Sequence, residues 1–245
     1  MSHQHHPRSL PPINGPLPAS GGSSRLALCL IHFVLAVSSG WGLKRSTGCQ
    51  AMAAFGIYFG HSLLCLLRHT HPNPGTLQRL VCDKSRRYSS VLFVTLVVGE
   101  LQALNPATRL GDFFGADWER LAFGLWSGAL ALAVASLWMG GSSGSSSNNS
   151  SSSRSPLGAA FVKLDAAQLG LCVLWNVHCL WRIAVVDEHW WSLGLALLVL
   201  LNHFILWRLP LHFNITQLEV TTVGMCFSAI FALNAIQEQV DAVAS

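Results

Sequence analysis

An acidic residue within an apolar stretch is the side chain of this sequence best placed to do chemistry. Glu100 lies in the apolar segment Ser89–Leu104. An ionised carboxylate inside a bilayer is costly, so such a residue faces a bundle interior, pairs with a partner or takes up a proton. When the chain is shifted by 68 positions and laid over itself without gaps, His32 falls on Glu100. Glu100 and His32 are therefore a candidate proton site; the alternative is a shallow segment with Glu100 near the interface.

A second candidate is a stripe of polar residues spaced three or four positions apart, which places them on one face of a helix. Asn202 and His203 in the following apolar segment could meet this stripe. The favoured interpretation is that the stripe joins helices through hydrogen bonds, and the alternative is that it lines a substrate path. Its members are Asp165, Gln168, Cys172, Asn176, Cys179 and Arg182.

The histidines and cysteines give a weaker signal for a metal or cofactor. His61 and His203 lie at similar depths in their segments, so the pair could ligate haem, although hydrogen-bonded structural roles are favoured. The seven cysteines are dispersed and form no CxxC pair. This dispersion argues against a disulfide framework and against a zinc site. We therefore expect no metal and no cofactor.

The composition indicates an integral membrane protein. Of 245 residues, 51% are hydrophobic and only 11% are charged, whereas soluble domains carry about 25% charged residues. The mean hydropathy is +0.43, and nine tryptophans suit the two membrane–water interfaces. The basic residues form no dense cluster, which argues against nucleic-acid binding.

Apolar segments of about the length that spans a bilayer, near 20 residues, predict an all-α polytopic bundle. Six spans are an alternative to seven, because the third segment contains Glu100 and the seventh begins with polar residues. We expect the first segment to be retained rather than cleaved as a signal peptide, because a long polar stretch precedes it. The seven segments are Leu26–Leu43, Gln50–Leu67, Ser89–Leu104, Leu121–Gly140, Ala166–Val185, Trp190–Trp207 and Leu218–Ile236.

The polar stretches between and around these segments divide the chain. The N-terminal stretch is rich in Pro, Gly, Ser and His, which predicts a disordered tail. A run of Ser, Gly and Asn predicts a flexible linker between two membrane regions. The expected parts are a tail over 1–25, a four-span region over 26–140, the linker over 141–156, a two- to three-span region over 157–236 and a tail over 237–245.

Two similar stretches of sequence, "AFGIYFG" and "AFGLWSG", each contain a GxxxG spacing. It is formed by Gly56 with Gly60 in the first and by Gly124 with Gly128 in the second. Two glycines on one helix face let a neighbouring helix approach closely, and close contact drives helix association in lipid. We therefore predict tight packing at these four glycines. The similarity also predicts tandem parallel helical hairpins, unless the glycines recur only because membrane helices favour small residues.

Basic residues predict the orientation. With seven spans, ten Lys and Arg lie on the side of the N-terminus and five on the opposite side. By the positive-inside rule the N-terminus is cytoplasmic. The Ser- and Asn-rich linker points to a eukaryotic endomembrane or plasma membrane.

No GxSxG, HExxH, Walker, dinucleotide-binding or HxxHH pattern is present in the segments, which weakens the case for an enzyme. The leading prediction is a non-enzymatic scaffold, accessory subunit or assembly factor whose partners are the lipid bilayer and another membrane protein. The alternative is a small transporter or proton-linked carrier that uses Glu100. The third is a membrane redox enzyme containing haem, or a lipid-modifying enzyme.

Overall fold

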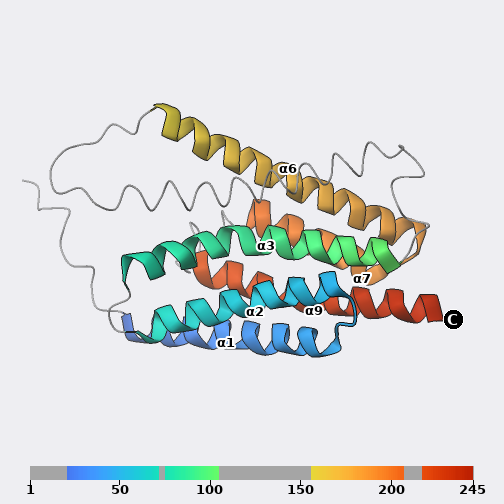
Figure 1. Ribbon diagram of the computed structural model, residues 1–245, viewed down its shortest axis with the longest axis horizontal. Helices are drawn as coiled ribbons and strands as arrows, with labels where there is room; N and C mark the ends of the chain where they lie inside the picture. The colour runs from blue at the N-terminus through green and yellow to red at the C-terminus, as the bar shows by residue number, and fades with distance from the viewer. Residues whose placement is uncertain (1–20, 72–74, 105–155, 207–216, 245) are drawn as a thin grey trace, which may run out of the picture.

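The computed structural model describes residues 21–71, 75–104, 156–206 and 217–244, and every regular element in these ranges is a helix (Figure 1). The α-helix that begins at Trp190 continues without a break into a short π-helix. The elements are α1 (Gly21–Arg45), α2 (Cys49–Thr70), α3 (Thr76–Leu104), α6 (Pro156–Val186), α7 (Trp190–Leu200), η2 (Leu201–Ile205) and α9 (Gln217–Ala244).

Four stretches of helix are long and apolar enough to cross a membrane. They are Arg25–Arg45, Cys49–Thr70, Ala167–Val186 and Glu219–Val243. They coincide with the first, second, fifth and seventh predicted segments, and they indicate a membrane-embedded helical protein.

The other three predicted segments have different outcomes. Ser89–Leu104 is helical but belongs to α3, whose polar first half keeps it out of the membrane-crossing set. Trp190–Trp207 corresponds to a shorter apolar helix, Trp190–Ile205. Leu121–Gly140 lies outside the described residues, as does the predicted linker 141–156 except for Pro156, which begins α6.

Two helices extend into the stretches that the sequence assigns to tails. Helix α1 already begins at Gly21, inside the predicted tail 1–25. Helix α9 continues to Ala244, through the predicted tail 237–245. Gln239 is 2% exposed, so packing against the bundle holds this last part of the helix.

Successive helices form antiparallel hairpins, and the last helix packs across them. Helix α1 packs against α2, α2 against α3, and α6 against α7. Helix α9 returns to lie beside α1, α3 and α7, and so closes the bundle (Figure 1). The outward faces are apolar, with Leu30, Phe33 and Trp181 more than half exposed, as expected where the surroundings are lipid.

Three aromatic rings fill the centre between α2 and α3. Tyr58 stacks on Phe93 with ring centroids 3.8 Å apart, and Phe55 meets Phe93 edge-on at 5.5 Å. All three side chains are at most 1% exposed. Such pairs add to the energy of burial, so this cluster fixes the register of α2 against α3.

The structure shows no close packing at Gly56 and Gly60 against the residues that it describes. A methyl group added at either glycine would meet no atom within 4 Å. Gly124 and Gly128 lie outside the described residues. Close approach occurs at other glycines instead: Gly42 lies against the ring of Phe55, and Gly224 lies against Asn202.

Candidate metal centre

Glu100 is buried near the end of α3, and the partner that the structure records for it is backbone. Its Oε2 atom accepts a hydrogen bond from the N–H of Ala51, the third residue of α2, at 3.2 Å. The residue before α2 is Gly48, which has no side chain to cap the helix, and the Glu100 carboxylate occupies the space where one would lie. A carboxylate at a helix N-terminus satisfies a free N–H and the helix dipole, so Glu100 caps α2 from α3.

The structure does not bring His32 to Glu100. His32 lies beside His61 and His69, with ring centroids 5.9 and 5.7 Å away. His61 is ten residues beyond Ala51 on α2, or about 15 Å along the helix axis. Glu100 and His32 therefore serve different ends of the bundle.

The capping role of Glu100 predicts a specific order of stabilities. Glu100→Ala should lower the free energy of unfolding by about 1–2 kcal/mol, because it leaves the α2 N-terminus uncapped in a buried setting. Glu100→Gln should cost less, since its amide oxygen can still accept from Ala51. Gly48→Ala should also destabilise, because its methyl group displaces the carboxylate. Thermal unfolding of the three variants in detergent measures this order, and equal stability of all three with wild type would contradict the cap.

The polar stripe of α6 connects that helix to α3. Asn176 donates from Nδ2 to Thr95 Oγ1 at 2.9 Å and to the carbonyl of Cys172 at 2.8 Å. Cys179 is hydrogen-bonded to Gln102. Gln168 and Arg182 are half-buried, whereas the side chain of Asp165 lies outside the described residues. These contacts support joining of helices as the role of the stripe.

The two residues expected to meet the stripe contact another helix. Asn202 donates to Ser228 Oγ of α9 at 3.3 Å. His203 lines a cavity to which His61 does not contribute. No contact between His61 and His203 is recorded among the described residues, and the haem pair inferred from their depths stays a prediction.

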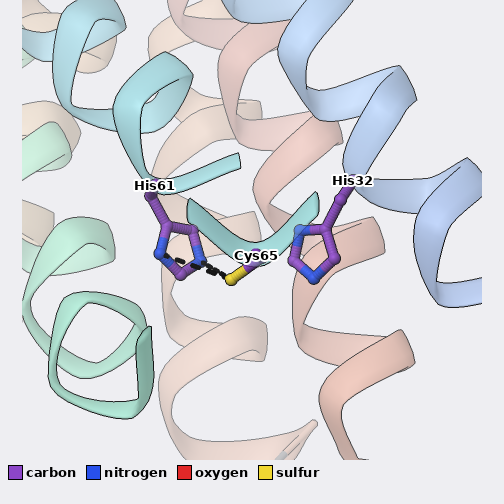
Figure 2. A group of neighbouring side chains, drawn as sticks. All are labelled: His32, His61 and Cys65. Atoms are coloured by element: carbon purple, nitrogen blue, oxygen red, sulfur yellow. Dashed lines mark hydrogen bonds between the residues drawn. The ribbon is translucent and has the colours of Figure 1, made fainter. Parts of the chain in front are cut away.

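His61 instead belongs to a cluster of histidine and cysteine side chains from α1 and α2. His61 and Cys65 are four residues apart and share one face of α2, and His32 reaches them from α1. One ligand atom from each residue lies within 4.8 Å of the other two. Figure 2 shows the Cys65 sulfur between the two imidazole rings.

The ring nitrogens of His32 are available to a ligand. The side chain is completely buried, yet neither ring nitrogen has a hydrogen-bond partner among the described residues. Unpaired polar atoms in a buried site are costly. A metal ion bound by one of these nitrogens would remove part of that cost.

His61 is oriented as a metal ligand usually is. Its Nδ1 lies 2.9 Å from Ser85 Oγ of α3, and a proton on Nδ1 would be donated to that hydroxyl. The Nε2 lone pair is then free, and this atom lies 3.7 Å from Cys65 Sγ. Metal-bound histidines commonly donate from their second nitrogen to fix the ring, and a tetrahedral zinc ion keeps its N and S ligands about 3.3–3.8 Å apart.

A fourth donor lies next to Cys65. Cys82 of α3 is buried, with its sulfur 2.7 Å from that of Cys65. The two thiols are within hydrogen-bond distance and either one can donate to the other, and the Arg68 guanidinium lies nearby. Arg68 is held in place by Asp83 at 2.6 Å. Cys82 thus places a further sulfur from a third helix beside the three-donor cluster of His32, His61 and Cys65.

This donor set selects a class of metal. Thiolate and imidazole ligands favour Zn²⁺ and Cu⁺, whereas Mg²⁺ and Ca²⁺ require oxygen ligands. Zn²⁺ with two thiolates is electrically neutral, as is Cu⁺ with one thiolate. A neutral centre avoids the cost of placing an uncompensated charge inside the bundle.

Cysteine spacing did not reveal this cluster, because it relates the cysteines only to one another and not to the histidines. The HxxxC spacing of His61 and Cys65 was the one local signal. His32 lies 29 residues before His61, on α1. Cys82 lies 21 residues after His61, on α3. Only the register of the α1–α2 and α2–α3 hairpins brings them together, so wide spacing along the chain was no evidence against a metal site.

No family model, curated protein or solved structure matches this chain.

Proposed function

We propose that this chain is a non-enzymatic, multi-pass membrane protein that holds one Zn²⁺ or Cu⁺ ion between α1, α2 and α3. His32, His61 and Cys65 are the core ligands, and Cys82 completes the set. The observation that carries the proposal is the convergence of these three donors within 4.8 Å around a fully buried histidine whose ring nitrogens have no hydrogen-bond partner among the described residues.

Burial of the donors supports a structural or accessory role. His32, His61 and Cys65 are at most 1% exposed. Structural metal sites are closed by protein ligands, whereas catalytic sites keep a position open to water or substrate. The ion would lock three helices in register, as befits a scaffold, accessory subunit or assembly factor that presents a fixed surface to another membrane protein.

The proposed topology has the N-terminus in the cytoplasm of a eukaryotic cell, with six or seven spans and tandem hairpins. Its support is the count of basic residues, ten on the side of the N-terminus and five on the opposite side. The acceptor sequences at Asn148, Asn149 and Asn214 would then face the cytoplasm. Glycan on any of them would contradict this orientation.

The metal content of the purified protein tests the proposed function. Wild type purified in detergent with a reductant and without chelators should carry about one zinc or copper ion per chain, measured by plasma mass spectrometry. Cys65→Ala and His32→Ala should each reduce this content at least fivefold, because three-ligand binding depends on both. The element found distinguishes Zn²⁺ from Cu⁺.

Matched variants separate ligand loss from general damage. Cys179→Ala removes another buried cysteine (1% exposed), and His178→Ala removes an exposed histidine, so both should retain wild-type metal content. Wild type that carries less than a tenth of an ion per chain after incubation with either metal would refute the proposal. Equal loss in Cys179→Ala and Cys65→Ala would refute it as well.

A further inference from the structure

Two thiols from neighbouring helices meet beside the metal centre. Cys65 of α2 and Cys82 of α3 are 0% and 3% exposed, and their sulfur atoms lie 2.7 Å apart. The ligands of a tetrahedral zinc ion lie about 3.3–3.8 Å apart, whereas the sulfurs of a disulfide lie about 2.0 Å apart. Joint binding of one ion would therefore require the two sulfurs to separate, and a disulfide would require only a small further approach.

The thiol pair is buried but lies close to the surface of the bundle. Arg68, three residues beyond Cys65, donates to Cys82 and to the carboxylate of Asp83 at 2.6 Å. The side chain of Asp83 is 53% exposed and follows Cys82 directly in the chain, so solvent comes within one residue of the pair. The Arg86 guanidinium also lies near Cys65. This setting admits an oxidant of about the size of water and excludes a bulky one.

The Cys65 sulfur belongs both to this pair and to the metal centre. It lies 3.7 Å from Nε2 of His61 as well as 2.7 Å from the sulfur of Cys82. The thiolate is the form of cysteine that binds a metal ion, and a sulfur in a disulfide is no longer a thiolate. A disulfide between Cys65 and Cys82 would leave only His32 and His61 as ligands, so the disulfide and the bound ion exclude each other.

We infer that Cys65 and Cys82 form a redox-active pair, which a hydroperoxide oxidises to a disulfide with release of the metal ion. The release of metal rests on the proposed function, whereas the disulfide does not. Cys82 is the less buried thiol and lies next to exposed Asp83, so we expect it to react first.

The oxidation takes place in two steps. The Cys82 sulfur attacks one oxygen of hydrogen peroxide, the O–O bond breaks, and a sulfenic acid and one water molecule form. The Cys65 sulfur then attacks the sulfenic sulfur, the S–S bond forms, and the hydroxyl group leaves with the Cys65 proton as a second water molecule. The two thiols lose two electrons, and the peroxide gains them. Two molecules of a thiol reductant restore both cysteines by thiol–disulfide exchange and become a disulfide themselves.

Peptide mapping of the metal-free full chain in detergent, after alkylation of the remaining thiols, tests the pair. One equivalent of hydrogen peroxide should link the peptides of Cys65 and Cys82 in most molecules, with loss of two hydrogen atoms, and a thiol reductant should separate them. Oxidised glutathione at the same concentration should form the link at least tenfold more slowly. In Cys65→Ser the sulfenic acid at Cys82 should persist and react with dimedone. Equal rates for the two oxidants would contradict a hydroperoxide as the oxidant.

Zinc-loaded protein tests the release of metal. Hydrogen peroxide should lower the zinc content of wild type at least fivefold, and a reductant with added zinc should restore it. Cys82→Ser keeps the three core ligands but cannot form the disulfide, so the same treatment should leave its zinc content within twofold of the starting value. Cys179→Ala, which removes a buried cysteine outside the pair, is the control and should respond as wild type does.

The two experiments separate this inference from the proposed function. Failure of metal-free wild type to form the Cys65–Cys82 disulfide would overturn the inference even in a chain that binds zinc. A disulfide in a chain that binds no zinc would support the redox pair and refute the proposed function alone. Equal zinc release from wild type and Cys82→Ser would show that the disulfide does not expel the ion.

Discussion

Metal-free protein should unfold about 10 °C below the metal-bound form. A ligand present at 1,000 times its dissociation constant stabilises the folded state by about 4 kcal/mol, and each kcal/mol shifts the midpoint by about 2–4 °C in a chain of this size. The ligands come from α1, α2 and, through Cys82, α3, so the ion crosslinks the helices that make up one half of the bundle. Thermal unfolding in detergent, before and after removal of the metal by a chelator, measures the shift.

The same experiment on a ligand variant separates specific binding from other effects of the chelator. Cys65→Ala should unfold at the low midpoint of the metal-free protein whether or not Zn²⁺ or Cu⁺ is added. Cys179→Ala, with an equally buried cysteine removed, should respond to the metal as wild type does. A midpoint of wild type that is independent of chelator and of added metal would show that no ion stabilises the fold.

Gly42→Leu should abolish accumulation of folded protein. Gly42 is buried in α1 against the ring of Phe55, which is 0% exposed, and a single added methyl group would already overlap that ring. Phe55 cannot retreat, because it packs against Phe93. Overpacking of a tight core costs about 1–3 kcal/mol or more, so Gly42→Ala should lower the unfolding midpoint and Gly42→Leu should drive α1 away from α2.

Gly56→Leu is the matched control, since Gly56 lies on the adjoining helix and faces open space. It should yield as much monodisperse protein in size-exclusion chromatography as wild type. If instead Gly56→Leu fails to accumulate while Gly42→Leu behaves like wild type, the observed packing of α1 on α2 would be wrong and the original GxxxG prediction right.

Gly42 and Gly56 show which part of the helix packing the sequence could predict. The spacing of Gly56 and Gly60 specifies a flat groove on α2, but a groove says nothing about whether a neighbour faces it. Gly42 belongs to no such motif. Its importance comes from Phe55, seven residues into the next helix, and that contact depends on the register of the hairpin.

For Glu100 too, the sequence bears on burial of the side chain but not on the identity of its hydrogen-bond partner. The cost of a carboxylate in apolar surroundings allows either a buried position or one near the interface, and the sequence left both open. Its partner could not be predicted, because Ala51 contributes only a backbone N–H, which every residue except proline carries. The missing cap at Gly48 becomes a signal only after α2 is known to begin at Cys49.

The membrane-crossing helices were the most predictable part of the molecule. Long apolar runs depend on local composition alone, and four of them are present as expected. The His and Cys cluster depends on three helices at once. Its donors are individually indistinguishable from the buried histidines and cysteines that occur elsewhere in the chain.

X-ray absorption at the K-edge of the bound metal tests the central claim most directly. The first shell should contain nitrogen and sulfur together, for zinc at about 2.0–2.1 Å and 2.3 Å respectively, and Cys65→Ala protein, which should bind little metal, should lose this signal. A first shell of nitrogen and oxygen only, or a spectrum unchanged by Cys65→Ala, would show that the ion lies elsewhere and that His32, His61 and Cys65 do not hold it.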